Sequence, residues 1–233
     1  MYPKKITPNP LVSSTVEIRF KTDKDSSVVF KSFYESLTEI FPKVETTSFP
    51  KDLRAKNPEL RYYPDYILSN ENYSLSFNEY FLGFENITEY QLWENYSKEL
   101  RQIIELIFKT NVIQEIERIG VRFQSAFNVE DFSSIINSKP SIEIRDFDEN
   151  FLSYTTQMKY NEFDMLLRLK KDVTESGFNN SEQQGHIIDI DVFISDDVDK
   201  TQVFSKVDLA HTLLKKLFFD LLKEDFVKSL NPE

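Results

Sequence analysis

The sequence predicts an α+β fold in which one or two antiparallel sheets carry three long helices on one side. Several segments alternate apolar and polar residues with a period of two, which is typical of strands with one buried face. Three longer segments place apolar residues three and four positions apart, which is typical of amphipathic helices. The longest alternating segment is 115–127, EIERIGVRFQSAF. Because this segment exceeds the usual strand length of about 5–6 residues, we expect it to be a central strand.

The first half of the chain alternates strand and helix patterns in a recognisable order. We expect Ser26 to cap the first helix and Thr88 with Gln91 to form a capping box before the second. The expected strands and helices, in chain order, are strand 15–21, helix 26–41, strand 62–69, strand 73–81, helix 88–110 and strand 115–127. This is the β-α-β-β-α-β order of ferredoxin-like folds.

The second half has a different organisation, with a meander of strands before one helix. We expect a polar loop at 171–185, and we expect Leu213, Leu217 and Leu221 to dock the last helix, which Ser205 caps. The expected strands are 141–145, a hairpin of 152–159 and 163–170, and 187–194. We expect the two halves, 1–130 and 131–233, to meet near residue 130 in one compact unit.

Composition excludes several classes of function. The 233 residues carry a formal net charge of −11, which argues against nucleic-acid binding because such proteins usually show a basic face. There is no Cys and only two His, which excludes disulfides, zinc ribbons, iron–sulfur clusters and cysteine nucleophiles. No apolar run is long enough for a membrane span, so we expect a cytoplasmic protein without membrane contact. Neither of the two glycine-rich nucleotide-binding motifs, GxGxxG and GxxxxGK(S/T), occurs in the sequence, and nothing identifies a cofactor.

Charged residues at outward strand positions are the candidate site. Two arginines four positions apart along one strand face could clamp a phosphate or carboxylate, and Gly120 between them would leave space for it. Asp189 and Asp191 could share Mg²⁺ or Ca²⁺, although ion pairing with the arginines is favoured over a metal. The wider alternative is that all of these charges form cross-strand pairs on a solvated face. The candidate ligand-binding residues are Arg118, Arg122, Arg168, Asp189 and Asp191.

Neither histidine nor the tyrosines indicate catalysis. His211 lies near the apolar stripe of the last helix, where a packing role is favoured over a catalytic one. His186 is expected at an exposed strand start. The tyrosines between residues 62 and 73 could stack bases, but they have few basic neighbours apart from Arg61, which favours packing. No catalytic residue and no metal ligand is assigned.

Four segments together resemble a sporadically distributed bacterial family of uncharacterised function. They are NPLVSSTVEIRF (9–20), ERIGVRF (117–123), IDIDVF (188–193) and LAHTLLKKLF (209–218). The family has a Pro-Leu start, an Arg-Ile-Gly-x-Arg strand and a late helix beginning around Leu-x-His. This resemblance covers nearly the whole chain, implies no catalytic residues, and associates the protein with mobile-element or defence genes.

A second resemblance is to the triphosphate tunnel enzymes, whose barrels turn acidic and basic side chains inward onto a polyphosphate and a metal. Glu115 and Glu117 have the E-x-E spacing of those enzymes, but Ile119 occupies the position of their lysine. We therefore interpret the chain as a non-enzymatic cytoplasmic binding or protein-interaction module, with an unidentified protein or a second copy as partner. The alternative is a binder or hydrolase of a phosphorylated small molecule that uses the charged sheet face.

Overall fold

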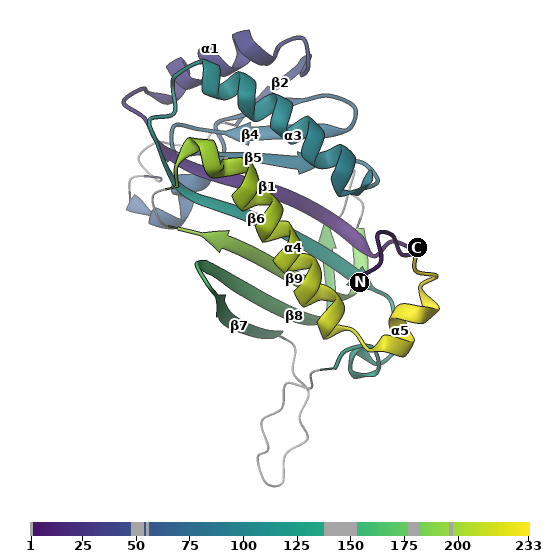
Figure 1. The fold of residues 1–233 in the computed structure, drawn as a ribbon. Coiled ribbons are helices and arrows are strands. Elements are labelled where there is room, and N and C mark those ends of the chain that lie inside the picture. The colour runs from purple at the N-terminus through teal and green to yellow at the C-terminus, as the bar shows by residue number, and fades with distance from the viewer. Residues whose placement is uncertain (1, 48–53, 55, 138–152, 177–181, 196–197) are drawn as a thin grey trace. The chain divides into compact units, whose positions relative to one another are not determined.

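The structure is a computed structural model that describes residues 2–47, 54, 56–137, 153–176, 182–195 and 198–233 (Figure 1). These residues form a mixed helix and strand fold with antiparallel strand pairs, which confirms the coarse fold class. The strands are β1 Leu11–Lys21, β2 Lys43–Thr46, β3 Tyr66–Ser69, β4 Tyr73–Phe77, β5 Phe81–Asn86, β6 Glu115–Phe127, β7 Ser153–Tyr160, β8 Phe163–Ser176 and β9 Glu182–Ile194. The helices are α1 Ser26–Leu37, α3 Leu92–Lys109, α4 Val203–Leu221 and α5 Glu224–Ser229. Short 3-10 helices are η1 Pro58–Tyr62, η2 Phe132–Ser134 and η4 Lys200–Gln202.

The strands follow the hydrogen-bonded order β2-β3-β4-β5-β1-β6-β9-β8-β7. Strands β2 and β7 stand at the two ends of this order. The predicted central strand at 115–127 is confirmed as β6, which has neighbours on both sides.

The chain divides into two compact units, each assembled from separate segments. Unit 1 comprises Met1–Ser14, Val121–Phe193 and Asp208–Glu233, and unit 2 comprises Thr15–Gly120 and Ile194–Val207. The expected domain organisation, with halves 1–130 and 131–233, stays a prediction.

Unit 2 packs helices α1 and α3 over one face of its strands (Figure 1). The alternation in β1 explains this face, because Val16, Ile18 and Phe20 are fully buried. Aromatic rings fill the layer between helices and strands: Phe33 of α1 lies 5.2 Å from Phe77, measured between ring centroids. From α3, the Tyr96 hydroxyl donates to the carbonyl of Phe84 at 2.7 Å. The opposite, polar face of β1 carries Glu17 and Arg19.

Unit 1 contains the predicted hairpin, which is confirmed as β7 and β8. Tyr160 pairs with Phe163, and Asn161 in the two-residue turn has a φ of 52°. This left-handed conformation is one that Asn tolerates better than most residues. On α4, Leu213 and Leu221 are buried as predicted, whereas Leu217 is only partly buried.

The ferredoxin-like order is not confirmed. The predicted strand at 73–81 is two strands, β4 and β5, and β2 lies between α1 and β3. The described order in this half is therefore β-α-β-β-β-β-α-β. Asn78 explains the break, because its side chain accepts from the Tyr80 backbone N–H at 2.7 Å and closes a turn within the apolar run. The prediction of three long helices is also not confirmed as made, since α1 has 12 residues and the described part of the chain also contains the short helix α5.

Helix starts differ from the predicted caps by short distances. Asp25 caps α1, because its carboxylate accepts from the N–H groups of Ser27 and Val28, both at 3.0 Å. The Ser26 hydroxyl instead donates to Asp65. The predicted capping box before α3 is wrong, since Gln91 is the N-cap and makes no side-chain cap bond. Helix α4 begins at Val203, before the predicted cap Ser205.

Strand ends also extend further than the alternation predicted. Strand β1 begins at Leu11 and not at residue 15, and β8 and β9 continue into the predicted polar loop at 171–185. A register shift between Lys170 and Val173 makes this extension irregular. The predicted strand at 141–145 lies outside the described residues.

Candidate functional site

The polar sheet face of unit 1 brings three of the predicted site residues together around Asp189. Arg122 on β6 donates from Nε to Asp189 Oδ1 at 2.8 Å and from Nη2 to Oδ2 at 2.7 Å. Arg168 on β8 donates from Nη1 to the same Oδ2 at 3.2 Å. Because Arg168 is the direct register partner of Asp189, the carboxylate lies between two guanidinium groups, in an Arg–Asp–Arg row across the strands. We call these three residues the Asp189 cluster.

Asp189 is fully buried, whereas the two arginines that bind it remain partly open to solvent. The Asp189 side chain is 0% exposed, whereas the side chains of Arg122 and Arg168 are 45% and 28% exposed. A guanidinium has five N–H donors. Among the described residues, only Asp189 accepts from Arg168, through one nitrogen, so its remaining N–H groups have no protein acceptor there. The Asp189 cluster itself consists of two cations and one anion.

The other two predicted site residues lie outside the Asp189 cluster. Asp191 lies two positions further along β9, where its register partner on β8 is Leu166 and not an arginine. Arg118 belongs to unit 2 and binds Glu17. The hypothesis that Asp189 and Asp191 share a metal finds no support in the described residues, where no group of three or more acidic or histidine ligands is gathered.

The polar sheet face of unit 2 repeats the same arrangement around Glu17. Glu17 Oε1 accepts from Arg19 Nε at 2.7 Å and from Arg118 Nη1 at 2.6 Å. The Arg118 side chain is 11% exposed, so it is the more buried of the two arginines. A Cβ added at Gly120 would lie 2.5 Å from Arg118 Nη1. The space that Gly120 leaves is therefore filled by the arginine of the same strand and not kept open for a ligand.

Sequence reasoning missed the residues that surround Arg19. The guanidinium carbon of Arg19 lies 3.8 Å from the ring centroid of Tyr62, in a cation–π contact. Arg61 lies 4.4 Å from the ring centroid of Tyr80. The tyrosine-rich segment and Arg61 were visible in the sequence, but nothing in it placed Tyr62 against the first strand. The long separation between residues 19 and 62 hides the contact from any local pattern.

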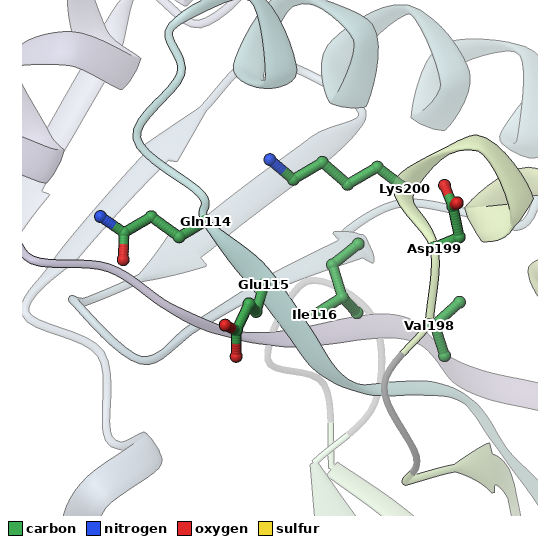
Figure 2. Close-up of a pocket in the computed structure, with 6 residues that line it drawn as sticks. All are labelled: Gln114, Glu115, Ile116, Val198, Asp199 and Lys200. Atoms are coloured by element: carbon green, nitrogen blue, oxygen red, sulfur yellow. The ribbon is translucent and has the colours of Figure 1, made fainter.

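A shallow cavity of about 590 Å³ lies where β6 begins, also within unit 2 (Figure 2). Figure 2 shows its six lining residues on two segments, Gln114–Ile116 and Val198–Lys200. Its charged groups are engaged locally: Glu115 pairs with Lys21 at 2.6 Å, and Lys200 Nζ donates to the Ile113 carbonyl at 2.6 Å. Asp199 accepts from the Thr201 N–H at 2.8 Å. These bonds leave the cavity few groups with which to hold a ligand.

Both histidines have structural surroundings. His186 is 1% exposed, stacks on Phe132 with ring centroids 4.9 Å apart, and lies 2.9 Å from the Val129 carbonyl through Nε2. The prediction that it is exposed is wrong. His211 faces Phe123 with ring centroids 5.7 Å apart. Burial, with a smaller contribution from Lys215, lowers the pKa of His211 to about 3. At neutral pH its imidazole is therefore uncharged.

A comparison of the chain with family models found no match, and neither did a comparison with curated proteins. In the part of the chain that the structure describes, no helix is both long and apolar enough to cross a membrane.

Proposed function

We propose that this protein is a non-enzymatic binding module that holds an acidic segment of a protein partner against the polar sheet face of unit 1. The observation that carries the proposal is the Asp189 cluster, in which Arg168 has N–H groups without a protein acceptor among the described residues. Arg122 is already oriented by its two bonds to Asp189. Arginines held in this way lose little conformational freedom when a carboxylate binds them.

The exposure of the arginines favours a protein partner over an enclosed small molecule. Small-molecule pockets bury about 70–90% of a ligand's surface. The Arg122 side chain is 45% exposed on a strand face, where an extended acidic segment can approach from solvent. Arginine is also enriched at protein–protein interfaces. A second copy of the chain is one partner of this kind, since the protein carries a net charge of −11.

The surroundings of the histidines support a non-enzymatic function. His211 stays neutral down to about pH 3 and faces Phe123. His186 is buried against Phe132. The pKa of His211 is therefore far from the value near the operating pH that suits a general acid or base, and His186 is buried away from solvent.

A second candidate function is the binding of a phosphorylated small molecule at the same cluster. It is favoured by the shared Oδ2 of Asp189, which Arg122 and Arg168 contact at 2.7 and 3.2 Å. Because Arg122 Nη2 and Arg168 Nη1 donate to the same oxygen, the distance between these two nitrogens cannot exceed the sum of the two hydrogen-bond lengths. Both guanidinium groups could therefore reach one phosphate.

Thermal melting at low salt with defined probes tests both candidates. The probes are a glutamate-rich decapeptide, inorganic tripolyphosphate and a lysine-rich decapeptide. At a concentration of 100 Kd, a ligand adds about 2.7 kcal/mol to the stability of the folded state. For a chain of this size we expect the glutamate-rich peptide to raise the midpoint by roughly 5–10 °C. A shift with tripolyphosphate alone would favour the second candidate.

Variants show whether a shift in the melting midpoint comes from binding at the Asp189 cluster. Arg168→Gln should remove the stabilisation by the peptide without unfolding the protein, because Arg122 still binds both oxygens of Asp189. The matched control is Arg101→Gln on α3, which removes the same charge from a residue in contact with Phe204 in unit 2. The proposal fails if Arg168→Gln melts with the same peptide-induced shift as the wild type. Sedimentation velocity over a range of concentrations reports whether the partner is a second copy.

A further inference from the structure

The polar face of unit 2 carries a stack of arginine and tyrosine side chains that the Asp189 cluster does not involve. Arg19 from β1 lies 3.8 Å from the Tyr62 ring centroid. Arg61 lies 5.7 Å from the same centroid and 4.4 Å from that of Tyr80. We call these four residues the Arg–Tyr cluster. The rings hold the planar guanidinium groups by their faces, which leaves the N–H edges for other partners.

A buried amide fixes the position of the cluster. Asn78 is 0% exposed, and its side-chain nitrogen donates to the backbone carbonyls of Arg61 at 2.8 Å and Tyr63 at 2.9 Å. Its side-chain oxygen accepts from the Tyr80 N–H at 2.7 Å. One buried side chain thus ties the 3-10 helix η1, which carries Arg61 and Tyr62, to the turn that carries Tyr80. The cluster is built on the fold and not on a free loop.

Most hydrogen-bond donors of the two arginines are unused. Within the described residues, Arg19 donates only from Nε, to Glu17. No hydrogen bond or ion pair within the described part of the chain engages the Arg61 guanidinium, which contacts the two rings. With five N–H donors in each guanidinium, the Nη groups of Arg19 and the whole Arg61 group are available.

The acids near the cluster are bound by arginines. Glu17 Oε1 accepts from both Arg19 and Arg118. The adjoining acids, Asp65 and Glu79, are turned onto another arginine: Arg54 Nη2 lies 2.5 Å from Asp65 and Arg54 Nη1 lies 3.9 Å from Glu79. Arg54 thus offsets part of the negative charge of these two acids.

We propose that the Arg–Tyr cluster is a second anion site, and that it binds a phosphate group of a small phosphorylated compound. A carboxylate would be satisfied by the fork of one arginine, whereas a phosphate offers enough oxygen atoms for two. Nucleic acid does not fit, because the protein has a net charge of −11. The guanidinium contacts with Tyr62 and Tyr80 also occupy ring faces on which a base would stack. This inference is independent of the proposed function of the Asp189 cluster.

Isothermal titration of the full chain with inorganic tripolyphosphate tests the site. We expect the wild type to bind it and Arg61→Gln to weaken binding at least tenfold. Arg61 is exposed and makes no hydrogen bond through its guanidinium in the described residues, so the substitution leaves folding intact. Tyr80→Leu should weaken binding because the stack that orients Arg61 is lost, whereas Tyr80→Phe should retain it.

Two control variants distinguish binding at the Arg–Tyr cluster from a general charge effect and from binding at the Asp189 cluster. Arg101→Gln removes the same charge elsewhere in unit 2, and Arg168→Gln removes it from the Asp189 cluster. Both should bind tripolyphosphate as the wild type does. The inference is overturned if the wild type does not bind, if Arg61→Gln binds equally well, or if Arg101→Gln weakens binding as much as Arg61→Gln. It is also overturned if Arg168→Gln alone abolishes binding, or if single-stranded RNA binds more tightly than tripolyphosphate.

Discussion

Lowering the pH from 7 to 5 should destabilise this protein through His211, and the structure sets the size of the effect. Burial beside Phe123 lowers the pKa of His211 to about 3 in the folded state, whereas an unfolded histidine has a pKa of about 6.5. Between these two values the unfolded chain binds a proton that the folded chain does not. Stability from this residue is therefore complete above about pH 6.5 and is lost as the pH falls towards 3.

The magnitude at pH 5 follows from the same pKa difference. pH 5 lies about 1.5 pH units below the pKa of an unfolded histidine. At this pH, a site that is protonated only in the unfolded state lowers the free energy of unfolding by at most about 2 kcal/mol. The His211 ring is partly exposed, so water reduces the penalty, and we expect a loss of about 1–2 kcal/mol.

Urea unfolding at pH 5 and at pH 7 measures this loss, with His211→Gln as the reference that cannot be protonated. All other titrating groups are common to both proteins, so the difference between the two pH dependences isolates His211. We expect the wild type to lose about 1–2 kcal/mol more than His211→Gln between pH 7 and pH 5. Parallel pH dependences, with no excess loss in the wild type, would refute the reasoning that His211 is held neutral by burial.

Two further outcomes concern unit 1, and urea unfolding measures both. Arg122→Ala should cost about 1–2 kcal/mol, more than an exposed pair usually contributes, because the fully buried Asp189 loses the donor to its Oδ1 and keeps, among the described residues, the bond from Arg168. An unchanged free energy of unfolding would show that water replaces Arg122 at no cost. Gly185→Ala should cost about 2–3 kcal/mol, since Gly185 has a φ of 142° and an added Cβ would lie 2.4 Å from the Phe127 carbonyl oxygen; a variant as stable as the wild type would mean that this backbone adapts freely.

Local patterns in the sequence were sufficient for the strand at 115–127 and for the β7–β8 hairpin. Both depend on alternation, which is a property of neighbouring residues, and burial of Ile119, Val121 and Phe123 then fixes which face the arginines occupy. Helix caps were less predictable. Asp25 and Ser26 are both good capping residues, and the choice between them depends on Asp65, which binds the Ser26 hydroxyl from 39 positions away.

The sequence by itself determined that the charged residues Glu17, Arg122 and Asp189 lie at polar strand positions, because a strand turns successive side chains to opposite faces. Only the tertiary structure decided which charges meet. Strand order and register set these pairs, and both depend on contacts between segments far apart in the chain. Arg122 therefore binds Asp189, 67 positions later, whereas Arg118 binds Glu17, 101 positions earlier. No local pattern encodes that choice, because only folding brings these side chains within hydrogen-bond distance.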